Sequence, residues 1–168
     1  QDSGASTVSV GKDHACALTN AGEIQCWGED WAGQSTVPAS LTENNWSSVH
    51  AGAYYTCAIA DTNDLHCWGQ GGPFNKTTVP DLASGTGWTS VSLSLDSACG
   101  LTNAGGIQCW GENSFGEGTV PALPEGATAW TAVSAGGWPS CGVTDTGVIQ
   151  CWGDDSNGES TVPAELQP

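Results

Sequence analysis

The chain has 168 residues, enough for one domain with a sizeable buried core. Its 18 acidic residues stand against two lysines and no arginine, so the formal net charge is -16 and no basic patch is available for a nucleic-acid partner. No stretch approaches the ~20 apolar residues of a membrane span, and we expect no membrane insertion.

A unit of about 42 residues is repeated four times along the chain. Each copy holds two cysteines ten residues apart, then Trp-Gly, then Val-Pro ten or eleven residues after that tryptophan. We expect a single repeat domain over 1–168, in which each unit buries its apolar faces against its neighbours. The expected units cover about 1–41, 42–83, 84–125 and 126–168.

In the first copy, residues 16–26 predict a β-hairpin. Asn20-Ala21-Gly22 forms its three-residue loop, with glycine where a left-handed conformation is needed. Folding about Ala21 places Cys16 opposite Cys26, at a separation that a disulfide spans. The same pattern predicts the pairs Cys57 with Cys67, Cys99 with Cys109, and Cys141 with Cys151. Free thiols or a zinc site are disfavoured because the sequence has no Cys-x-x-Cys.

The second copy shows the order of strands, which we expect over 46–50, 55–60 and 65–68. Side chains alternate along a strand, so the cysteines and aliphatic residues share one face and the tryptophan after the second cysteine points to the other. A sheet that is apolar on both faces must lie between neighbours, as the blades of a propeller do. We predict an all-β, β-propeller-like array of four ~42-residue blades, each a short antiparallel sheet with one cross-strand disulfide.

Eight cysteines in four equally spaced pairs indicate an oxidising compartment. The chain begins at Gln1 without a signal peptide, and we expect one to have been removed from an extracellular or cell-surface protein. Two sequons, at Asn45 and Asn75, are candidate glycosylation sites compatible with that location.

The run from Gly11 to Leu18, the turn Asn20-Ala21-Gly22, and the residues Cys26 to Asp30 with Gly33-Gln34 resemble the regulator of chromosome condensation repeat. The resemblance is closest to the cysteine-paired bacterial form and to the related propeller-type β-lactamase inhibitor proteins, and it covers all four copies. It implies a propeller fold. It does not fix an activity, because the family includes a nucleotide-exchange factor, enzyme inhibitors and uncharacterised secreted proteins.

Propellers of this family typically close with seven blades, whereas this chain has four. An open arc would expose apolar blade faces and strand edges at both ends. Joining Pro168 to Gln1 continues the repeat nearly in register, which suits a head-to-tail homopolymer or filament first, a closed four-blade ring second, and a ring of two chains third.

The first copy differs from the others at the start of its first strand. Ala5 stands where the later copies have Trp46, Trp88 and Trp130. The small residue leaves room for a side chain from another molecule, although a frayed N-terminus explains it equally well. The candidate self-assembly seam comprises Ala5, Val8, Val10, Val162 and Pro163.

The sequence contains no catalytic constellation, no cofactor motif and no paired-histidine metal motif. The residues 155–158 resemble part of a calcium loop but lack the bidentate glutamate. We interpret three histidines as drifted surface residues: His14, His50 and His66. Three aromatic residues interrupt small or polar positions and are candidates for ligand binding or for packing over a loop: Trp31, Phe115 and Trp138.

We predict a secreted, non-enzymatic structural protein that self-assembles head-to-tail through its terminal blades into an extracellular filament or other homopolymer. Its partner is itself, and no cofactor or metal is expected. The alternative is a secreted recognition module, a closed small propeller that binds a protein or glycan through its loop aromatics.

Overall fold

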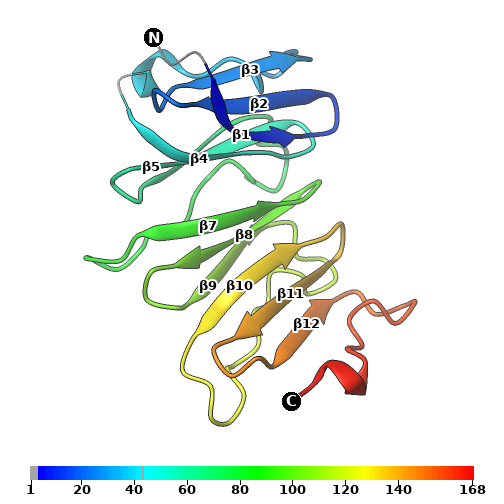
Figure 1. The fold of residues 1–168 in the computed structure, drawn as a ribbon. Coiled ribbons are helices and arrows are strands. Elements are labelled where there is room, and N and C mark those ends of the chain that lie inside the picture. The colour runs from blue at the N-terminus through cyan, green and yellow to red at the C-terminus, as the bar shows by residue number, and fades with distance from the viewer. Residues whose placement is uncertain (1–3, 43) are drawn as a thin grey trace. The chain divides into compact units, whose positions relative to one another are not determined.

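The computed structural model describes residues 4–42 and 44–168, and its strands form four three-stranded antiparallel sheets (Figure 1). We number these sheets as blades 1 to 4 in chain order. The chain divides into two compact units, with blades 1 and 2 in unit 1 (1–79) and blades 3 and 4 in unit 2 (80–168). The two units are described separately.

Each blade has the strand order of the sequence. Unit 1 contains β1 (Ala5–Val10), β2 (His14–Thr19), β3 (Ile24–Gly28), η1 (Ala39–Leu41), β4 (Trp46–Ala51), β5 (Tyr55–Ala60) and β6 (Leu65–Gly69). Unit 2 contains β7 (Trp88–Leu93), β8 (Ser97–Thr102), β9 (Ile107–Gly111), β10 (Trp130–Ala135), β11 (Pro139–Thr144), β12 (Ile149–Gly153) and η2 (Ala164–Leu166). Both 3-10 helices are single turns, and no helix in the described residues is long and apolar enough to cross a membrane.

The predicted fold class, with one cross-strand disulfide in each blade, is confirmed. Cys16 lies directly opposite Cys26 in the β2–β3 register, and the other three pairs repeat this placement. All four pairs are bonded, with Cα separations of 4.0–4.1 Å. The hairpin turn is also as expected, because Gly22 has a φ of 80°, in the left-handed region. Asn63 takes the corresponding conformation in blade 2, with a φ of 67°.

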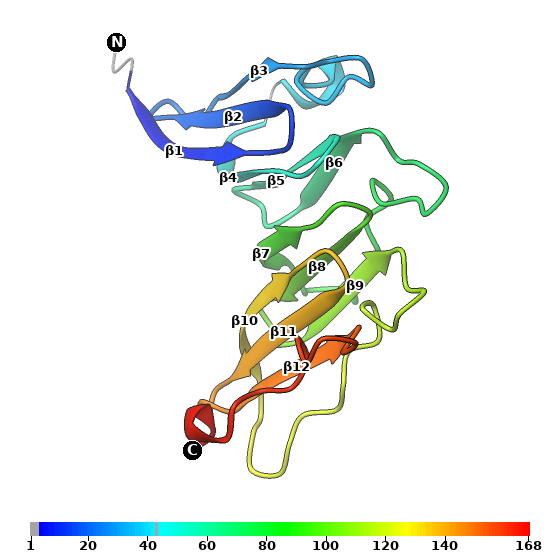
Figure 2. The ribbon, with the colours of Figure 1, turned by 90° about the vertical axis from the view of Figure 1, so that its right-hand side faces the viewer.

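Each blade has two apolar faces. We call the face with the two half-cystines the cysteine face, and the face with the tryptophan that follows the second one the tryptophan face. In unit 1, β4 lies beside β1 and β2 (Figure 2). The cysteine face of blade 1 packs there against the tryptophan face of blade 2. Unit 2 repeats this junction, with β10 beside β7 and β8 and the cysteine face of blade 3 against the tryptophan face of blade 4.

Candidate functional site: the tryptophan face of blade 1

The junctions inside the two units show what normally covers a tryptophan face. In unit 1, Trp46, Val49 and Trp68 are buried against Cys16 and Leu18 of the preceding blade. Paired indoles form the centre of each covered face, with ring centroids 6.4 Å apart for Trp46 and Trp68 and 5.9 Å apart in blade 4. The blade 4 pair is Trp130 and Trp152. The aliphatic cysteine face of one blade therefore covers two indoles of the next.

At both junctions, a hydrogen bond from a main-chain amide to a serine hydroxyl joins the first strands of the two adjacent blades. The Ala51 amide donates to Ser9 Oγ across the junction in unit 1, at 2.9 Å. The Ala135 amide donates to Ser92 Oγ in unit 2, also at 2.9 Å. Because the two bonds join equivalent residues, both junctions have the same register.

A polar turn follows the third strand of blades 1, 3 and 4, and one side chain holds each turn closed. Asp30 Oδ1 accepts the Ser35 amide at 2.8 Å. Asn113 Oδ1 accepts the Gly118 amide at 2.7 Å, and Asp155 Oδ1 accepts the Ser160 amide at 2.9 Å. A threonine hydroxyl adds a further bond in each turn; these residues are Thr36, Thr119 and Thr161. The three turns therefore share one internal hydrogen-bond pattern.

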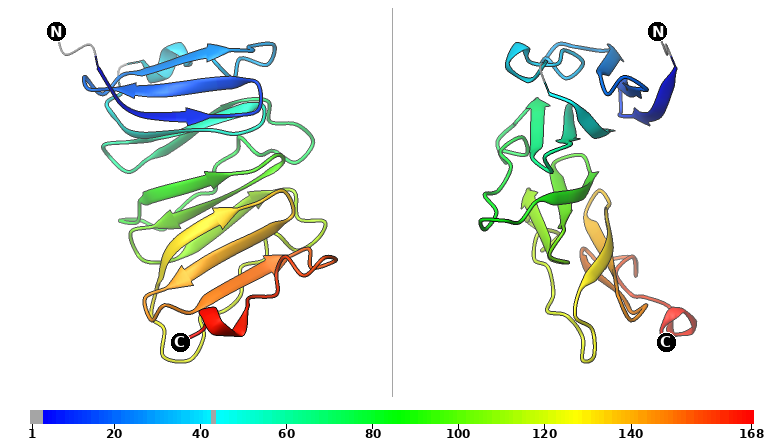
Figure 3. Two further views of the ribbon diagram at one scale, coloured as in Figure 1. Left: turned by 45° about the vertical axis from the view of Figure 1, so that its right-hand side comes forward. Right: turned by 60° about the vertical axis from the view of Figure 1, so that its left-hand side comes forward.

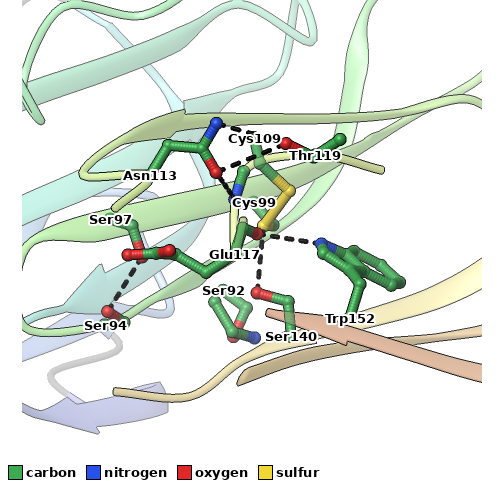
Figure 4. Close-up of a disulfide and its surroundings, with 12 residues drawn as sticks. Ser92, Ser94, Ser97, Cys99, Cys109, Asn113, Glu117, Thr119, Ser140 and Trp152 are labelled. Atoms are coloured by element: carbon green, nitrogen blue, oxygen red, sulfur yellow. Dashed lines mark hydrogen bonds between the residues drawn. A yellow bond between two sulfur atoms is a disulfide. The ribbon is translucent and has the colours of Figure 1, made fainter. Parts of the chain in front are cut away.

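These turns place a buried polar residue over the next blade. Gln34 and Glu117 are almost completely buried, and their side chains accept amides of their own turns, those of Ala32 and Phe115. The Glu117 carbonyl accepts the Trp152 indole N–H at 2.8 Å, which anchors the turn to blade 4 (Figure 4).

In unit 1, the hydroxyl of Thr56 anchors the equivalent turn. Thr56 Oγ1 donates to the Gln34 carbonyl at 2.8 Å. The turn also rests on the glycine that follows the tryptophan, because a side-chain carbon on Gly69 would lie 3.1 Å from the Gln34 Cα. The corresponding approach, between Gly153 and the Glu117 Cα, is 3.2 Å. Each turn thus binds to its neighbouring blade through its own backbone.

The tryptophan face of blade 1 has the equivalent valine and tryptophan, Val8 and Trp27, but within residues 4–42 and 44–168 both are exposed. Trp27 is 54% exposed, whereas its counterpart Trp68 is 6% exposed. Val8 is 63% exposed, and its counterpart Val49 is 5% exposed. Ala5, which is also exposed, stands where the covered faces have their second indole, so this face has only one. Val10 is exposed too. Trp27, Val8 and Val10 together form an apolar surface that is suited to binding a partner.

A hollow of about 220 Å³ lies beside Trp27 on blade 1. Its lining includes Val10, Lys12, His14, Ala15, Trp27 and Gly28. Gly28 corresponds to the glycines on which the polar turn rests in blades 2 and 4, and Trp27 corresponds to Trp152, whose indole N–H binds the turn in blade 4. The hollow therefore occupies the place where a polar turn lies at both covered junctions.

The histidine interpretation is wrong for His14, which is buried rather than a surface residue. Its Nε2 lies 2.7 Å from Thr56 Oγ1, whose own proton goes to the Gln34 carbonyl. Nε2 is therefore the donor, and Nδ1 has no hydrogen-bond partner among the described residues. Burial lowers the pKa of His14, against the smaller opposing effect of Asp13 and Asp30. Burial also lowers the pKa of His50, which is half-buried.

The cysteine face of blade 4 is the other uncovered surface of the predicted seam. Cys141, Val143 and Ile149 are only half-buried, although the equivalent Cys16 and Leu18 are buried in blade 1. The C-terminal segment lies along one side of the blade, where η2 follows β12 and Gln167 Nε2 donates to the Ile149 carbonyl (Figure 3).

Two seam residues lie in the same segment. Val162 is half-buried and Pro163 is exposed. Val162 corresponds to Val37, which packs on the junction core of unit 1. Leu166 of η2 is 56% exposed, whereas the corresponding Leu41 packs on that core. The residues that would complete a junction are therefore present at this end of blade 4.

The three candidate loop aromatics belong to two ring pairs, one within each unit. Phe115 and Trp138 are both exposed, and their ring centroids are 5.8 Å apart. Trp31 is also exposed and lies 5.8 Å from the ring of Tyr54, in an edge-on arrangement. Each pair joins the turn of one blade to the first hairpin loop of the next, so the aromatics both pack over a loop and present a surface.

The remaining candidates are surface features. Asn45 and Asn75 are exposed, as a sugar acceptor must be. The carboxylates of Asp154 and Asp155 accept hydrogen bonds from Ser156, Ser160 and Thr161 of their own turn. Hydrogen bonding lowers the pKa of Asp154, with the Ser156 hydroxyl as the main cause. No group of three or more potential metal ligands occurs in residues 4–42 and 44–168.

The buried turn residues were missed at the sequence level. Gln34 and Glu117, like the half-buried Glu159, each follow a glycine and lie eight residues after a second cysteine, but polar residues of this kind are usually exposed. The recurring Gly-Gln or Gly-Glu pair was the available signal. That pair does not recur in every copy, because Lys76 occupies the equivalent position in blade 2, and it therefore did not indicate that the position is buried.

The fold and the site together define a class: a disulfide-bonded β-propeller repeat protein whose blades bind one another through tryptophan faces. Residues 5–34, 88–117 and 130–159, more than half of the chain, match the Regulator of chromosome condensation (RCC1) repeat. The chain belongs to this repeat family, in its cysteine-paired form. Comparison with curated proteins gives no match.

Several solved propellers are similar in structure. The CRINKLY WD40 ectodomain of the Arabidopsis thaliana receptor kinase ACR4 has a TM-score of 0.65 and 26% identity over 90% of this chain and 51% of its own. The ectodomain of the Physcomitrella patens receptor kinase CR4 has a TM-score of 0.67 and 27% identity over 92% of this chain and 40% of its own. Yeast RCC1 (Prp20), solved bound to Kap60, has a TM-score of 0.75 and 18% identity over 92% of this chain and 45% of its own. The chain thus spans about half the length of these structures.

Proposed function

We propose that the chain is a non-enzymatic, extracellular protein-interaction module whose partner is a second copy of itself. The tryptophan face of blade 1 in one copy packs against the cysteine face of blade 4 in the next. The observation that carries the proposal is the exposure of Val8 and Trp27, whose counterparts are buried at the covered junctions. A contact between two different surfaces repeats from copy to copy, so it gives a filament or a closed ring of chains.

The two surfaces are complementary in residue type. Blade 4 offers Val143, Ile149 and Leu166 in the places that Leu18, Ile24 and Leu41 fill at the junction in unit 1. Ser134, which is exposed, corresponds to Ser9 and Ser92, and in a head-to-tail contact it would accept the amide of Val10. The contacts that join two blades within a unit can therefore form between two copies as well.

The extracellular location is supported by two features. Four disulfides persist in an oxidising environment such as the cell exterior. The two plant neighbours at 26% and 27% identity are receptor ectodomains. The solved complex of yeast RCC1 with Kap60 supports a role of this fold in protein binding.

The test is the association state of the native chain, measured by sedimentation velocity across the micromolar range. We expect a concentration-dependent series of oligomers. Trp27→Glu should abolish it, because it places a charge in the apolar centre of the contact. Trp31→Glu is the matched control, since this indole is similarly exposed but lies on a loop, and it should leave association intact. A native chain that stays monomeric throughout would overturn the proposal.

Mixing two blocked variants tests the head-to-tail geometry. Trp27→Glu blocks the blade 1 surface only, and Leu166→Glu blocks the blade 4 surface only, so each variant alone should remain monomeric. A mixture retains one good surface of each kind and should form a heterodimer that grows no further. A contact between two identical surfaces would give no heterodimer, and that result would also overturn the proposal.

A second candidate function rests on the exposed pair Phe115 and Trp138. Two aromatic rings held side by side on a loop surface suit a recognition module that binds a protein or a glycan. Titration with oligosaccharides, followed by tryptophan fluorescence, tests the glycan form of this function. A response that is lost in Trp138→Ala but retained in Trp31→Ala supports glycan recognition at this pair, and an unresponsive native chain excludes the glycan form of this function.

A further inference from the structure

We infer that the hollow beside Trp27 is a receptor for a preformed turn, residues 155–161, of a second copy. The inference rests on the proposed function and names the polar contact that positions one copy on the next. The ligand is a tight turn of backbone closed by acidic side chains, and Glu159 is the residue that lies over the hollow. The apolar faces supply the area of the contact, and this turn sets its register.

The first step is the match between the turns. The turn at 155–161 has the same internal bonds as those at 30–36 and 113–119, since Asp155 accepts the Ser160 amide and Glu159 Oε2 accepts the Asn157 amide at 2.7 Å. Gln34 and Glu117, the equivalents of Glu159, are buried over the next blade, whereas Glu159 is only half-buried. The turn is thus already shaped for a site that it does not fill within its own unit.

The second step is the match of the hollow to its equivalents. Gly28 corresponds to Gly69 and Gly153. At those two glycines the backbone of a turn lies where a side chain would otherwise be. The indole N–H of Trp27 corresponds to that of Trp152, which donates to the Glu117 carbonyl. In the inferred contact, the Trp27 indole donates to the Glu159 carbonyl of the second copy.

One element of the covered junctions is absent from blade 1. Thr56 and Ser140 place a hydroxyl beside the disulfide of the preceding blade, 3.8 Å from Cys16 Sγ and 3.7 Å from Cys99 Sγ. The hydroxyl of Thr56 also binds the turn. Ala15 stands at this position in blade 1 and lines the hollow. Adding a hydroxyl there should therefore strengthen the binding of the turn.

The lining of the hollow contains one lysine and one acidic side chain, Lys12 and Asp13. Lys12 lies at its edge, in a chain that has only two lysines and a net charge of -16. Lys12 contacts Tyr54, and this hydrogen bond raises the pKa of the lysine, so the ammonium stays charged at neutral pH. The Lys12 ammonium balances the Asp13 carboxylate there, so the hollow itself adds no net negative charge to the contact between two strongly acidic copies.

The experiment compares two isosteric substitutions, Ala15→Thr and Ala15→Val. Threonine and valine fill the same space, but only threonine donates a hydrogen bond to the turn of a second copy. We expect Ala15→Thr to associate roughly twofold to tenfold more tightly than Ala15→Val, as one net hydrogen bond predicts. Equal dissociation constants would overturn the inference, while Trp27-dependent association of the native chain would leave the proposed function in place.

A second pair of variants tests the turn itself. Glu159→Gln should retain association, because Gln34 serves the same purpose at the junction in unit 1. Glu159→Ala should weaken it, because the Asn157 amide loses its acceptor and the turn loses its shape. If both variants associate like the native chain, the turn is not the ligand. If the native chain does not associate at all, both the inference and the proposed function are wrong.

Discussion

The two units have the same apolar junction but differ in their polar residues. Both bury a pair of indoles against a disulfide and two aliphatic side chains of the preceding blade. All the basic side chains lie in unit 1: Lys12, Lys76, His14, His50 and His66. Residues 80–168 contain no lysine, arginine or histidine. The apolar junction is therefore common to both units, whereas the basic residues are confined to unit 1.

The two lysines of unit 1 lie beside two neighbouring tyrosines, Tyr54 and Tyr55. The Lys12 ammonium lies 4.7 Å from the centre of the Tyr54 ring, and that of Lys76 lies 5.3 Å from the centre of the Tyr55 ring. Lys76 is buried at the position that Gln34 and Glu117 occupy in other blades. A buried ammonium over an aromatic ring is thus one way to accommodate a polar residue where the other turns use an amide or a carboxylate.

The largest expected effect is a difference in unfolding free energy between alanine variants of Trp152 and Trp27, which occupy the same position in the repeat. Trp152→Ala should cost about 3–5 kcal/mol of unfolding free energy, because it leaves a cavity beside Trp130 and removes a hydrogen bond. Trp27→Ala should change stability by less than about 1 kcal/mol, since this indole is largely exposed. Urea unfolding of both variants at a concentration where the native chain is dissociated measures the difference. Equal losses would mean that the blade 1 face is covered within the chain.

The hairpin register followed from the sequence because three independent patterns agreed. The ten-residue cysteine spacing, the turn around Ala21 and the alternation of apolar residues all require Cys16 opposite Cys26. The buried residues Gln34 and His14 could not be predicted in this way. Their burial depends on contacts with the next blade, at Thr56, and local propensity carries no information about such contacts.

Removal of a disulfide should have the next largest effect, and it should differ between blade 1 and blade 4. Each bond closes a loop of the same length, so the loss of chain constraint is alike, at about 2–4 kcal/mol. Cys16 belongs to the junction core, whereas Cys141 is half-buried. Replacing Cys16 and Cys26 by alanine should therefore destabilise the chain more than replacing Cys141 and Cys151, as measured by thermal unfolding. The reverse order would contradict the assignment of the two faces.

The pH dependence of stability should also distinguish the units. Burial lowers the pKa of His14 and His50, so the folded chain binds fewer protons than the unfolded chain once the pH falls below about 6.5. Unit 1 should therefore lose stability between neutral pH and pH values near 5. Unit 2 has no histidine and should not, although both units contain carboxyls with lowered pKa values that matter at more acidic pH. These carboxyls are Asp30, Asp145 and Asp154.

Hydrogen exchange at pH 7 and pH 5.5 measures this difference, after correction for the intrinsic exchange rate. Amides of β2, which begins with His14, and of β5, whose Thr56 contacts His14, should lose protection at the lower pH, whereas those of β8 and β11 should keep it. His14→Gln retains a donor to Thr56 and cannot titrate, so it should reduce the loss in unit 1. Equal losses in the two units would exclude histidine as the cause.

The smallest expected effect comes from Ala5→Trp, which gives blade 1 the indole that blades 2 and 4 bury. Ala5 lies opposite Thr19, as Trp46 lies opposite Ala60, so the new indole should reach Trp27 as Trp46 reaches Trp68. We expect association to tighten several-fold, because the second indole adds buried apolar area only in the contact between copies. Ala5→Ser is the control and should not change the dissociation constant in sedimentation velocity. An indole at position 5 that left the dissociation constant unchanged would mean that the partner of blade 1 is not a cysteine face.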